Sequence, residues 1–189
     1  MDKYIYIHGF GGSGLGVKAS LFREYFGDTI ICPSLSYVPA LAIDTLKQLI
    51  EQMVDHATVT LIGSSLGGYY AMYLAEHYGI KAVLINPSIY PYETLQKVYG
   101  IAFNYHDESK FEWNEKHIHA LRDYDVQDIT PQQYLVLLQT EDELLDYRQA
   151  QRKFQNATVI VEEGGNHSYK NIESKFEIIE SFAHRSSFL

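Results

Sequence analysis

The sequence is poor in several features that mark whole classes of protein. Its 189 residues include a single cysteine, Cys32, which excludes an intramolecular disulfide framework and a metal site built from several cysteines. The net charge is −9 and no run of lysine and arginine occurs, which argues against a surface for nucleic acid. No apolar run approaches membrane-spanning length, and no signal-peptide pattern follows the first residues. We therefore expect a soluble, cytoplasmic protein without nucleic-acid or membrane partners.

The composition is that of an ordinary globular domain. Hydrophobic residues make up 46% of the chain and charged residues 21%, and a chain of this length can bury a sizeable core. No linker, low-complexity tract or internal repeat interrupts the sequence. We expect residues 1–189 to form a single domain.

Strand-like and helix-like segments alternate along the chain. The predicted strands are residues 4–7, 29–32, 59–62, 81–85, 134–138 and 158–161, and the predicted helices are residues 17–26, 40–54, 69–77, 145–154 and 172–182. Apolar residues run continuously through the strands, which indicates burial on both faces. The pattern therefore predicts an α/β fold with a mostly parallel central sheet and helices on both of its faces.

One segment breaks this alternation. Residues 92–128, after the strand that ends near Ile85, are polar and rich in tyrosine and histidine. They lie between two core strands, where a cap or lid insert is expected. Its histidines do not form a compact ligand motif, so we interpret them as solvated lid residues rather than a metal site. Tyrosines in and beside the insert are candidates for lining an apolar acyl pocket, namely Tyr90, Tyr92, Tyr99 and Tyr105.

The most informative motif is G-x-S-x-G at residues 63–67, with Ser65 at its centre. It follows a predicted strand and precedes a predicted helix, which is the setting of a catalytic serine turn. Such a turn pushes the serine out of the sheet, and Gly63 and Gly67 supply positions without a Cβ. The Leu66 N–H at the helix start is then available to an oxyanion. The alternative is a glycine-serine turn without chemistry, because the motif is short.

A serine nucleophile needs a base, and the base needs an orienting acid. In the α/β-hydrolase plan these follow in the order Ser, Asp or Glu, His, each in a loop after a core strand. His167 follows the strand at 158–161 and a Gly-Gly turn. Of the eight histidines, it alone meets both the order and the loop requirement. We predict that His167 is the base.

The orienting acid has several candidates after the strand at 134–138. We favour Asp142 because it lies in the loop that follows the strand. Glu141 and Glu143 flank it. Asp146 lies one helical turn further on and remains an alternative, although an acid in the first turn of a helix is also explained by the helix dipole.

The loop after the first strand contains His8, Gly9 and Phe10. An H-G-x loop at this place presents a second backbone donor, the Phe10 N–H, to an oxyanion. We interpret His8 as a structural residue that hydrogen-bonds within its own loop.

The same loop also fits the dinucleotide fingerprint G-x-G-x-x-G at residues 9–14. That interpretation requires an acid about 20 residues further on for the ribose. No aspartate or glutamate occurs between Thr29 and Ile43. The fingerprint also leaves the serine turn unexplained, so we expect no nucleotide cofactor.

Taken together, these blocks resemble the small bacterial YqiA-like esterases of the α/β-hydrolase fold, over nearly the whole chain. The resemblance rests on residues 8–10, 18–20, 63–70, 86–87, 142–150 and 163–167. One departure is Glu141, where the family tends to have glycine. The resemblance implies a serine esterase that acts on carboxylic ester or acyl thioester substrates, with Ser65, Asp142 and His167 as its triad.

The expected function is therefore hydrolysis of a small-molecule acyl ester or thioester through an acyl-enzyme, with no cofactor and no metal. Two alternatives remain open at this point. An acyltransferase would use the same triad and exclude water. A non-catalytic binding protein on the same fold would need none of the catalytic parts.

Overall fold

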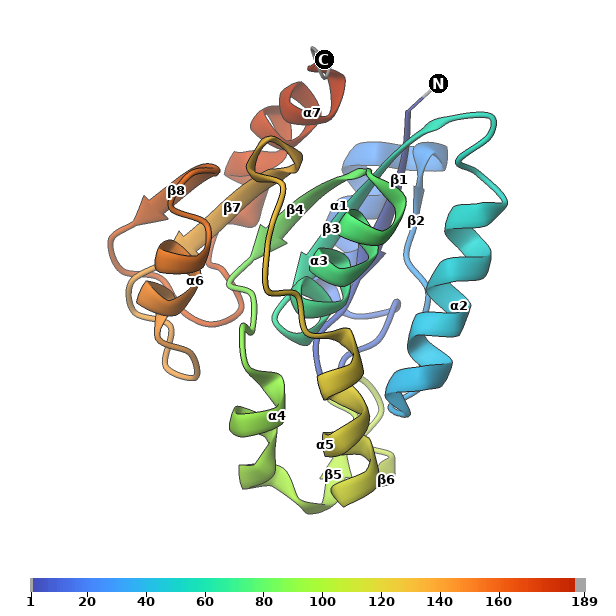
Figure 1. The fold of residues 1–189 in the computed structure, drawn as a ribbon, viewed down its shortest axis with the longest axis vertical. Helices are drawn as coiled ribbons and strands as arrows, with labels where there is room; N and C mark the ends of the chain where they lie inside the picture. Colours follow the sequence, from blue (N-terminus) through green and yellow to red (C-terminus); the bar gives the residue numbers. More distant parts are fainter. Residues whose placement is uncertain (1, 186–189) are drawn as a thin grey trace.

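The structure is a computed structural model that describes residues 2–185. Its core is a six-stranded parallel sheet in the order β2-β1-β3-β4-β7-β8 (Figure 1). The strands are β1 (Asp2–Ile7), β2 (Ile30–Ile31), β3 (Thr58–Ser64), β4 (Lys81–Ile85), β7 (Tyr134–Gln139) and β8 (Thr158–Glu162). Each predicted strand is present, so the predicted α/β fold with a parallel sheet is confirmed.

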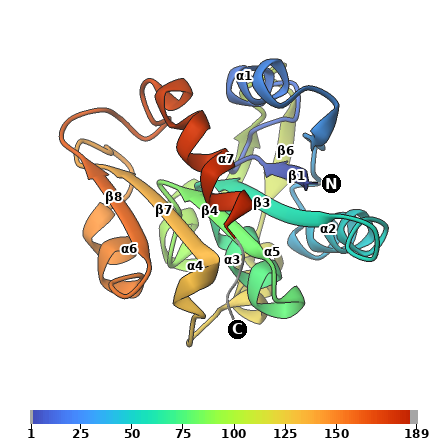
Figure 2. The same ribbon diagram turned by 90° about the horizontal axis from the view of Figure 1, so that it is seen from above.

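Helices cover both faces of this sheet (Figure 2). One face carries α1 (Val17–Phe26) and α7 (Phe176–His184), and the other carries α2 (Pro39–Glu51), α3 (Leu66–Tyr78) and α6 (Tyr147–Lys153). Successive strand residues point to opposite faces. Tyr6 therefore packs with Phe22 of α1, whereas Ile7 belongs to the cluster that contains α2 and α3.

Several helix ends differ from the sequence prediction. The last helix, predicted over 172–182, opens with a 3-10 turn, η5 (Ile172–Lys175), and α2 ends three residues earlier than expected. The helix predicted over 145–154 begins only at Tyr147, because Asp146 caps its N-terminus. Two further 3-10 turns are η1 (Gly27–Thr29) and η4 (Pro131–Gln133).

The segment between β4 and β7 is folded rather than open. It comprises α4 (Pro91–Thr94), η2 (Leu95–Val98), β5 (Gly100–Phe103), β6 (Lys110–Trp113), α5 (Glu115–Leu121) and η3 (Arg122–Tyr124). β5 and β6 pair as an antiparallel hairpin, and Figure 1 shows the whole segment beyond one end of the sheet. Trp113 is fully buried and its ring lies 4.9 Å from that of Phe10. The aromatic residues of this segment thus anchor it to the loop after β1.

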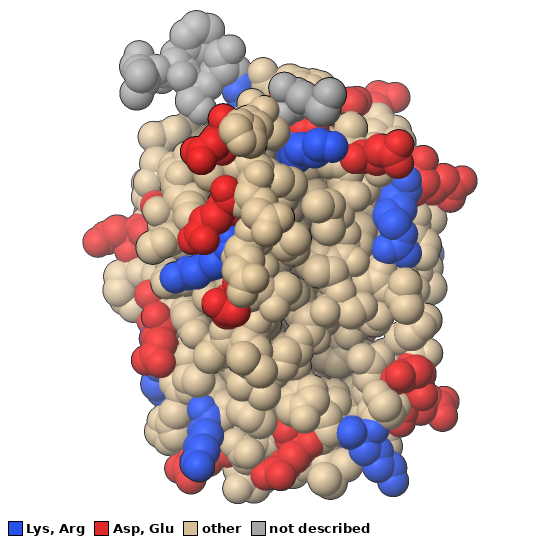
Figure 3. Space-filling model, turned by 90° about the vertical axis from the view of Figure 1, so that its right-hand side faces the viewer, with Lys and Arg blue, Asp and Glu red and all other residues tan. Residues whose placement is uncertain are grey.

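On the face drawn in Figure 3, lysine, arginine and acidic side chains are mixed around the margin and the centre is uncharged. Among residues 2–185, no helix combines the length and apolar character required to cross a membrane.

Candidate active site

Ser65 lies in a sharp turn between β3 and α3. Its backbone has φ 55° and ψ −120°, a conformation that is strained for a residue with a side chain. A Cβ at Gly63 would overlap the Gly67 carbonyl, and a Cβ at Gly67 would overlap the Ile7 carbonyl. The two glycines of the motif are therefore required by close backbone packing, and the predicted strand-turn-helix geometry is present.

The turn brings Ser65 to His167. The Ser65 Oγ lies 2.9 Å from His167 Nε2, and His167 Nδ1 lies 2.8 Å from Asp142 Oδ2 and 2.9 Å from Oδ1. An ionised carboxylate only accepts hydrogen bonds, so Nδ1 carries the proton and Nε2 is free to accept one from the serine. The three residues are in the geometry that serine activation requires.

The Asp142 carboxylate is held in place on its other side as well. Its side chain is 2% exposed, and Oδ1 accepts hydrogen bonds from the N–H groups of Leu144 and Leu145, both at 2.9 Å.

Asp146 is placed differently. It is the N-cap of α6, just outside the helix in which the sequence placed it, and accepts a hydrogen bond from Arg148 N at 3.0 Å. Of the candidate acids, Asp142 is the one against the His167 ring.

Two polar residues that the sequence analysis did not assign hold the His167 loop. Asn86, just after β4, donates from Nδ2 to the carbonyls of Asn166 (3.0 Å) and His167 (3.1 Å). Gln139, at the end of β7, accepts from Asn166 N at 3.1 Å and Lys170 N at 2.8 Å. Both are buried. Their signal in the sequence is a polar residue directly at the carboxyl end of an apolar strand.

Glu143 supports the same loop through the backbone of His167. Its Oε2 accepts a hydrogen bond from His167 N at 2.9 Å, and this bond is the main reason that the pKa of Glu143 is lowered. Glu143 thus binds the backbone of the histidine while Asp142 binds its ring.

We expect Asn86→Gly to lower kcat by at least ~10-fold with a small change in KM. Glycine tolerates the positive φ of 39° at this position, so the substitution removes only the side chain that fixes the His167 loop. The lost hydrogen bonds should also reduce the free energy of unfolding by about 1–3 kcal/mol. Steady-state kinetics and denaturant unfolding measure the two effects.

The matched control for this prediction is Gln155→Ala, since Gln155 is exposed on the surface. An Asn86→Gly protein with the wild-type kcat would show that the loop is held without Asn86.

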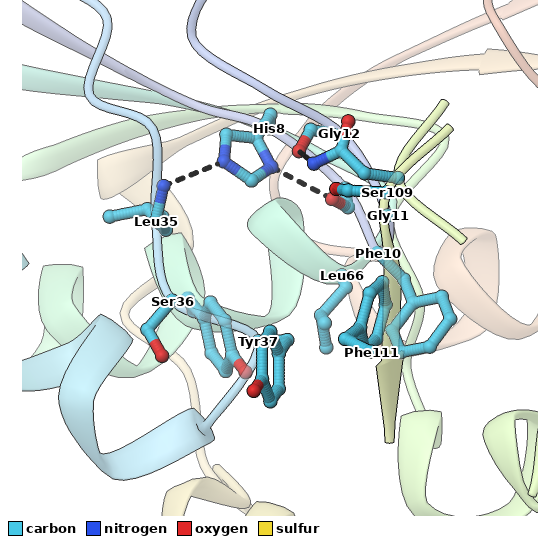
Figure 4. Close-up of a pocket in the computed structure, with 13 residues that line it drawn as sticks. His8, Phe10, Gly11, Gly12, Leu35, Ser36, Tyr37, Leu66, Ser109 and Phe111 are labelled. Carbon is cyan, nitrogen blue, oxygen red and sulfur yellow. Dashed lines mark hydrogen bonds between the residues drawn. The ribbon is translucent and has the colours of Figure 1, made fainter. Parts of the chain in front are cut away.

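His8 hydrogen-bonds within its own loop, as predicted, and also to a second segment of the chain (Figure 4). Its Nδ1 donates to the Gly9 carbonyl at 2.8 Å, and its Nε2 accepts from Leu35 N at 2.9 Å. Burial lowers the pKa of this imidazole, so the ring is neutral in the physiological range. With both nitrogens engaged, His8 orders the loop that carries Gly9 and Phe10.

The two residues expected to supply the oxyanion donors, Phe10 and Leu66, directly follow Gly9 and Ser65 in the chain. A Cβ on Gly9 would be 3.1 Å from Ser65 Cβ and 3.6 Å from Ser65 Oγ, so the loop before Phe10 passes directly over the serine. Leu66 is the first residue of α3. Among residues 2–185, the N–H groups of Phe10 and Leu66 donate to no other protein group.

A cavity of about 860 Å³ opens at Ser65 and His167. Its wall is largely apolar, with side chains from α1, η2, the loop after β7 and η5; examples are Leu21, Leu95 and Leu145. Of the four tyrosines expected to line an acyl pocket, Tyr105 does so, and the other three are absent from the lining. The insert contributes aliphatic side chains from η2 instead.

Two histidines of the insert, His117 and His119, have structural partners. His117 Nδ1 accepts from Asn114 N in a capping box at the start of α5, and His119 lies 3.4 Å from Glu115. Within the described range 2–185, no three histidine, cysteine or acidic side chains are grouped so as to hold a metal ion.

Comparison with known proteins identifies the family of this sequence. The model of the Uncharacterised protein family (UPF0227) matches residues 3–184. A UPF0227 protein from Citrobacter koseri is 25% identical over 94% of this chain and 97% of its own length. The UPF0227 protein YcfP from Salmonella gallinarum is 26% identical over the same shares of the two chains.

Solved structures with the same fold are α/β hydrolases. Mouse alpha/beta hydrolase domain-containing protein 10 superposes with a TM-score of 0.70 at 18% identity, over 95% of this chain and 87% of its own. Est1E from Butyrivibrio proteoclasticus gives a TM-score of 0.69 at 15% identity, over 96% of this chain and 85% of its own. These similarities establish the α/β-hydrolase fold.

Proposed function

The chain belongs to the UPF0227 family, and from the geometry of its Ser65–His167–Asp142 group we propose that it is a serine hydrolase that cleaves carboxylic esters or acyl thioesters. The observation that carries the proposal is the continuous hydrogen-bonded path from Ser65 Oγ through the His167 ring to Asp142. The resemblance to YqiA-like esterases supports the same function. So does the similarity to the esterase domain of a Rhodothermus marinus protein, which superposes with a TM-score of 0.69 at 15% identity over 96% of this chain and 85% of its own.

In the proposed first step, Ser65 Oγ attacks the acyl carbon while His167 Nε2 takes its proton. The carbonyl oxygen becomes an oxyanion, which the Phe10 and Leu66 N–H groups stabilise. Asp142 keeps Nδ1 protonated and stabilises the imidazolium. Collapse of the tetrahedral intermediate expels the alcohol or thiol, which receives the proton from His167, and leaves the acyl group on Ser65.

The second step reverses these roles with water. His167 takes a proton from a water molecule, whose oxygen attacks the acyl carbon, and the proton then returns to Ser65 as the acid leaves. The cavity beside Ser65 receives the acyl or alcohol portion of the substrate, and the segment at 92–128 acts as its cap. The apolar lining favours an aliphatic group there.

The proposal is tested with a panel of esters and thioesters of graded acyl length, with an added alcohol as a competing acceptor. We expect release of free acid to dominate, with one chain length preferred. Dominant formation of the transferred ester would identify an acyltransferase. No turnover of any panel member, together with no reaction of Ser65 with an activated phosphonate, would leave only a binding role.

Removing divalent metal ions should leave this activity unchanged, because the triad supplies the nucleophile and the base, and the backbone N–H groups of Phe10 and Leu66 supply the oxyanion donors. The measurement is kcat/KM before and after dialysis against a chelator. A loss that a divalent ion restores would contradict the proposed mechanism.

A further inference from the structure

Lys18, the second residue of α1, reaches into the cavity that contains Ser65 and His167. Its Nζ donates a hydrogen bond of 2.7 Å to the Oγ of Ser64, the residue directly before Ser65. The ammonium therefore lies at the end of β3, beside the serine turn. Neither the triad nor the oxyanion donors of the proposed mechanism use it.

The charge of Lys18 is not neutralised by the protein. Among residues 2–185 it makes no ion pair, and Ser64 Oγ, a neutral hydroxyl, is its protein acceptor. An ammonium has three donors, so two are left for another group. Burial lowers the pKa of Lys18 to about 8, an effect that Asp142 partly opposes. The side chain is thus still mostly protonated at neutral pH.

Two other half-buried lysines, Lys81 and Lys175, are satisfied more fully. Lys81 donates to backbone carbonyls at the end of α7, and Lys175 pairs with the Glu162 carboxylate. Removing a cation from water is costly unless an anion or several acceptors replace the solvent. Lys18 is desolvated without such compensation, at the wall of a cavity that faces the proposed nucleophile.

The remaining charged groups of the cavity leave this position open to an anion. Glu143, which also lines the cavity, already binds the His167 N–H, and Glu173 lies exposed on η5. Lys97, on η2, is the other lysine of the lining and is exposed to solvent. The cavity thus combines an apolar wall with one partly desolvated cation near the reacting centre.

We propose that Lys18 binds a carboxylate carried by the substrate, so that the preferred substrates are esters or thioesters with a free carboxylate a few bonds from the scissile carbonyl. This inference rests on the hydrolase function proposed above and specifies its substrate class. The carboxylate receives the two free N–H donors of the ammonium, while the apolar wall contacts the carbon chain between the two ends.

The test compares charged and neutral esters of matched length by titrating the acid released. One series places the carboxylate on the acyl side, with the monoethyl esters of succinate, glutarate and adipate against ethyl butyrate, pentanoate and hexanoate. A second series places it on the alcohol side, with butyryl glycolate and butyryl 3-hydroxypropionate against ethyl and propyl butyrate. In one of the two series we expect kcat/KM to favour the charged ester by about 10- to 100-fold, as for a hydrogen bond between charged groups.

Lys18→Met should bring this ratio to about 1, while Lys18→Arg should retain a preference for the charged ester. The ratio cancels any loss that is common to both substrates. Lys97→Met is the matched control, because Lys97 lines the same cavity but is exposed, and it should keep the wild-type ratio.

A wild-type ratio near 1 in both series, or an unchanged ratio in Lys18→Met, would overturn the inference and leave the hydrolase function standing. If no ester is turned over at all, the hydrolase function fails instead. Calorimetric titration with glutarate then tests whether Lys18 binds an anion. Binding by the wild-type protein that is lost in Lys18→Met would support the inference, and no binding by the wild-type protein would oppose it. If Lys18→Met does not fold, the same titration is carried out with Lys18→Arg in its place.

Discussion

Replacement of Ser65 by alanine is expected to reduce ester hydrolysis to near background while the fold persists. The substitution removes the Oγ that lies 2.9 Å from His167 Nε2 and leaves no nucleophile to form the acyl-enzyme. In a well-studied serine protease, loss of the nucleophile lowers kcat by about 10⁶-fold, and we expect at least ~10³-fold here. Alanine keeps the same Cβ in the strained turn, so the free energy of unfolding should change by no more than about 1 kcal/mol.

Steady-state kinetics on the best ester of the panel and thermal unfolding provide the two readouts. The matched control is Ser20→Ala, since Ser20 is an exposed serine on α1 away from the turn. Retention of more than about a tenth of the wild-type kcat by Ser65→Ala, a far smaller loss than removal of a serine nucleophile causes, would show that another group attacks the substrate.

Replacement of Asp142 by asparagine should lower kcat by at least ~10²-fold. An asparagine amide can donate to His167 Nδ1, which stabilises the tautomer with its proton on Nε2, and that tautomer cannot accept the proton of Ser65. The corresponding change in a well-studied triad costs about 10⁴-fold. The asparagine oxygen can still accept from Leu144 N and Leu145 N, so the loop should remain folded.

Asp146→Asn is the control for this prediction. It removes a carboxylate from the same segment but keeps an oxygen that can cap α6, so the unfolding free energy should fall by about 0.3–1 kcal/mol through the helix dipole, with turnover nearly intact. The reverse pattern, with low turnover in Asp146→Asn and full turnover in Asp142→Asn, would assign the orienting role to Asp146.

The sequence predicted the sheet well because its strands are short, continuous apolar runs that only a buried parallel sheet explains. The serine turn could be predicted equally well, since Gly63 and Gly67 are required by the close approach of the backbone around Ser65. The chain order of a serine, an acid and a histidine, each in the loop after a strand of the sheet, also predicted which loops meet at the site. These features are local or follow from topology.

What the sequence did not predict depends on contacts between distant segments. The bonds from Asn86 to the His167 loop join residues about 80 positions apart, and nothing in the local pattern specifies them. The insert was predicted as a polar lid. In the structure it forms a hairpin and helices, and its Phe111 and Trp113 pack against Phe10. Lys18 lies in one of the blocks that carry the family resemblance, but only the fold places its ammonium at Ser64.

The central claim, that Ser65 is an activated nucleophile, is tested most directly by locating the adduct of a fluorophosphonate. The wild-type protein should gain one phosphonyl group, and fragmentation of the labelled peptide should place it on Ser65. Because labelling requires the neutral His167 as base, it should be slowed in Asp142→Asn and absent in Ser65→Ala. An unlabelled wild-type protein, or an adduct that persists in Ser65→Ala, would contradict the account.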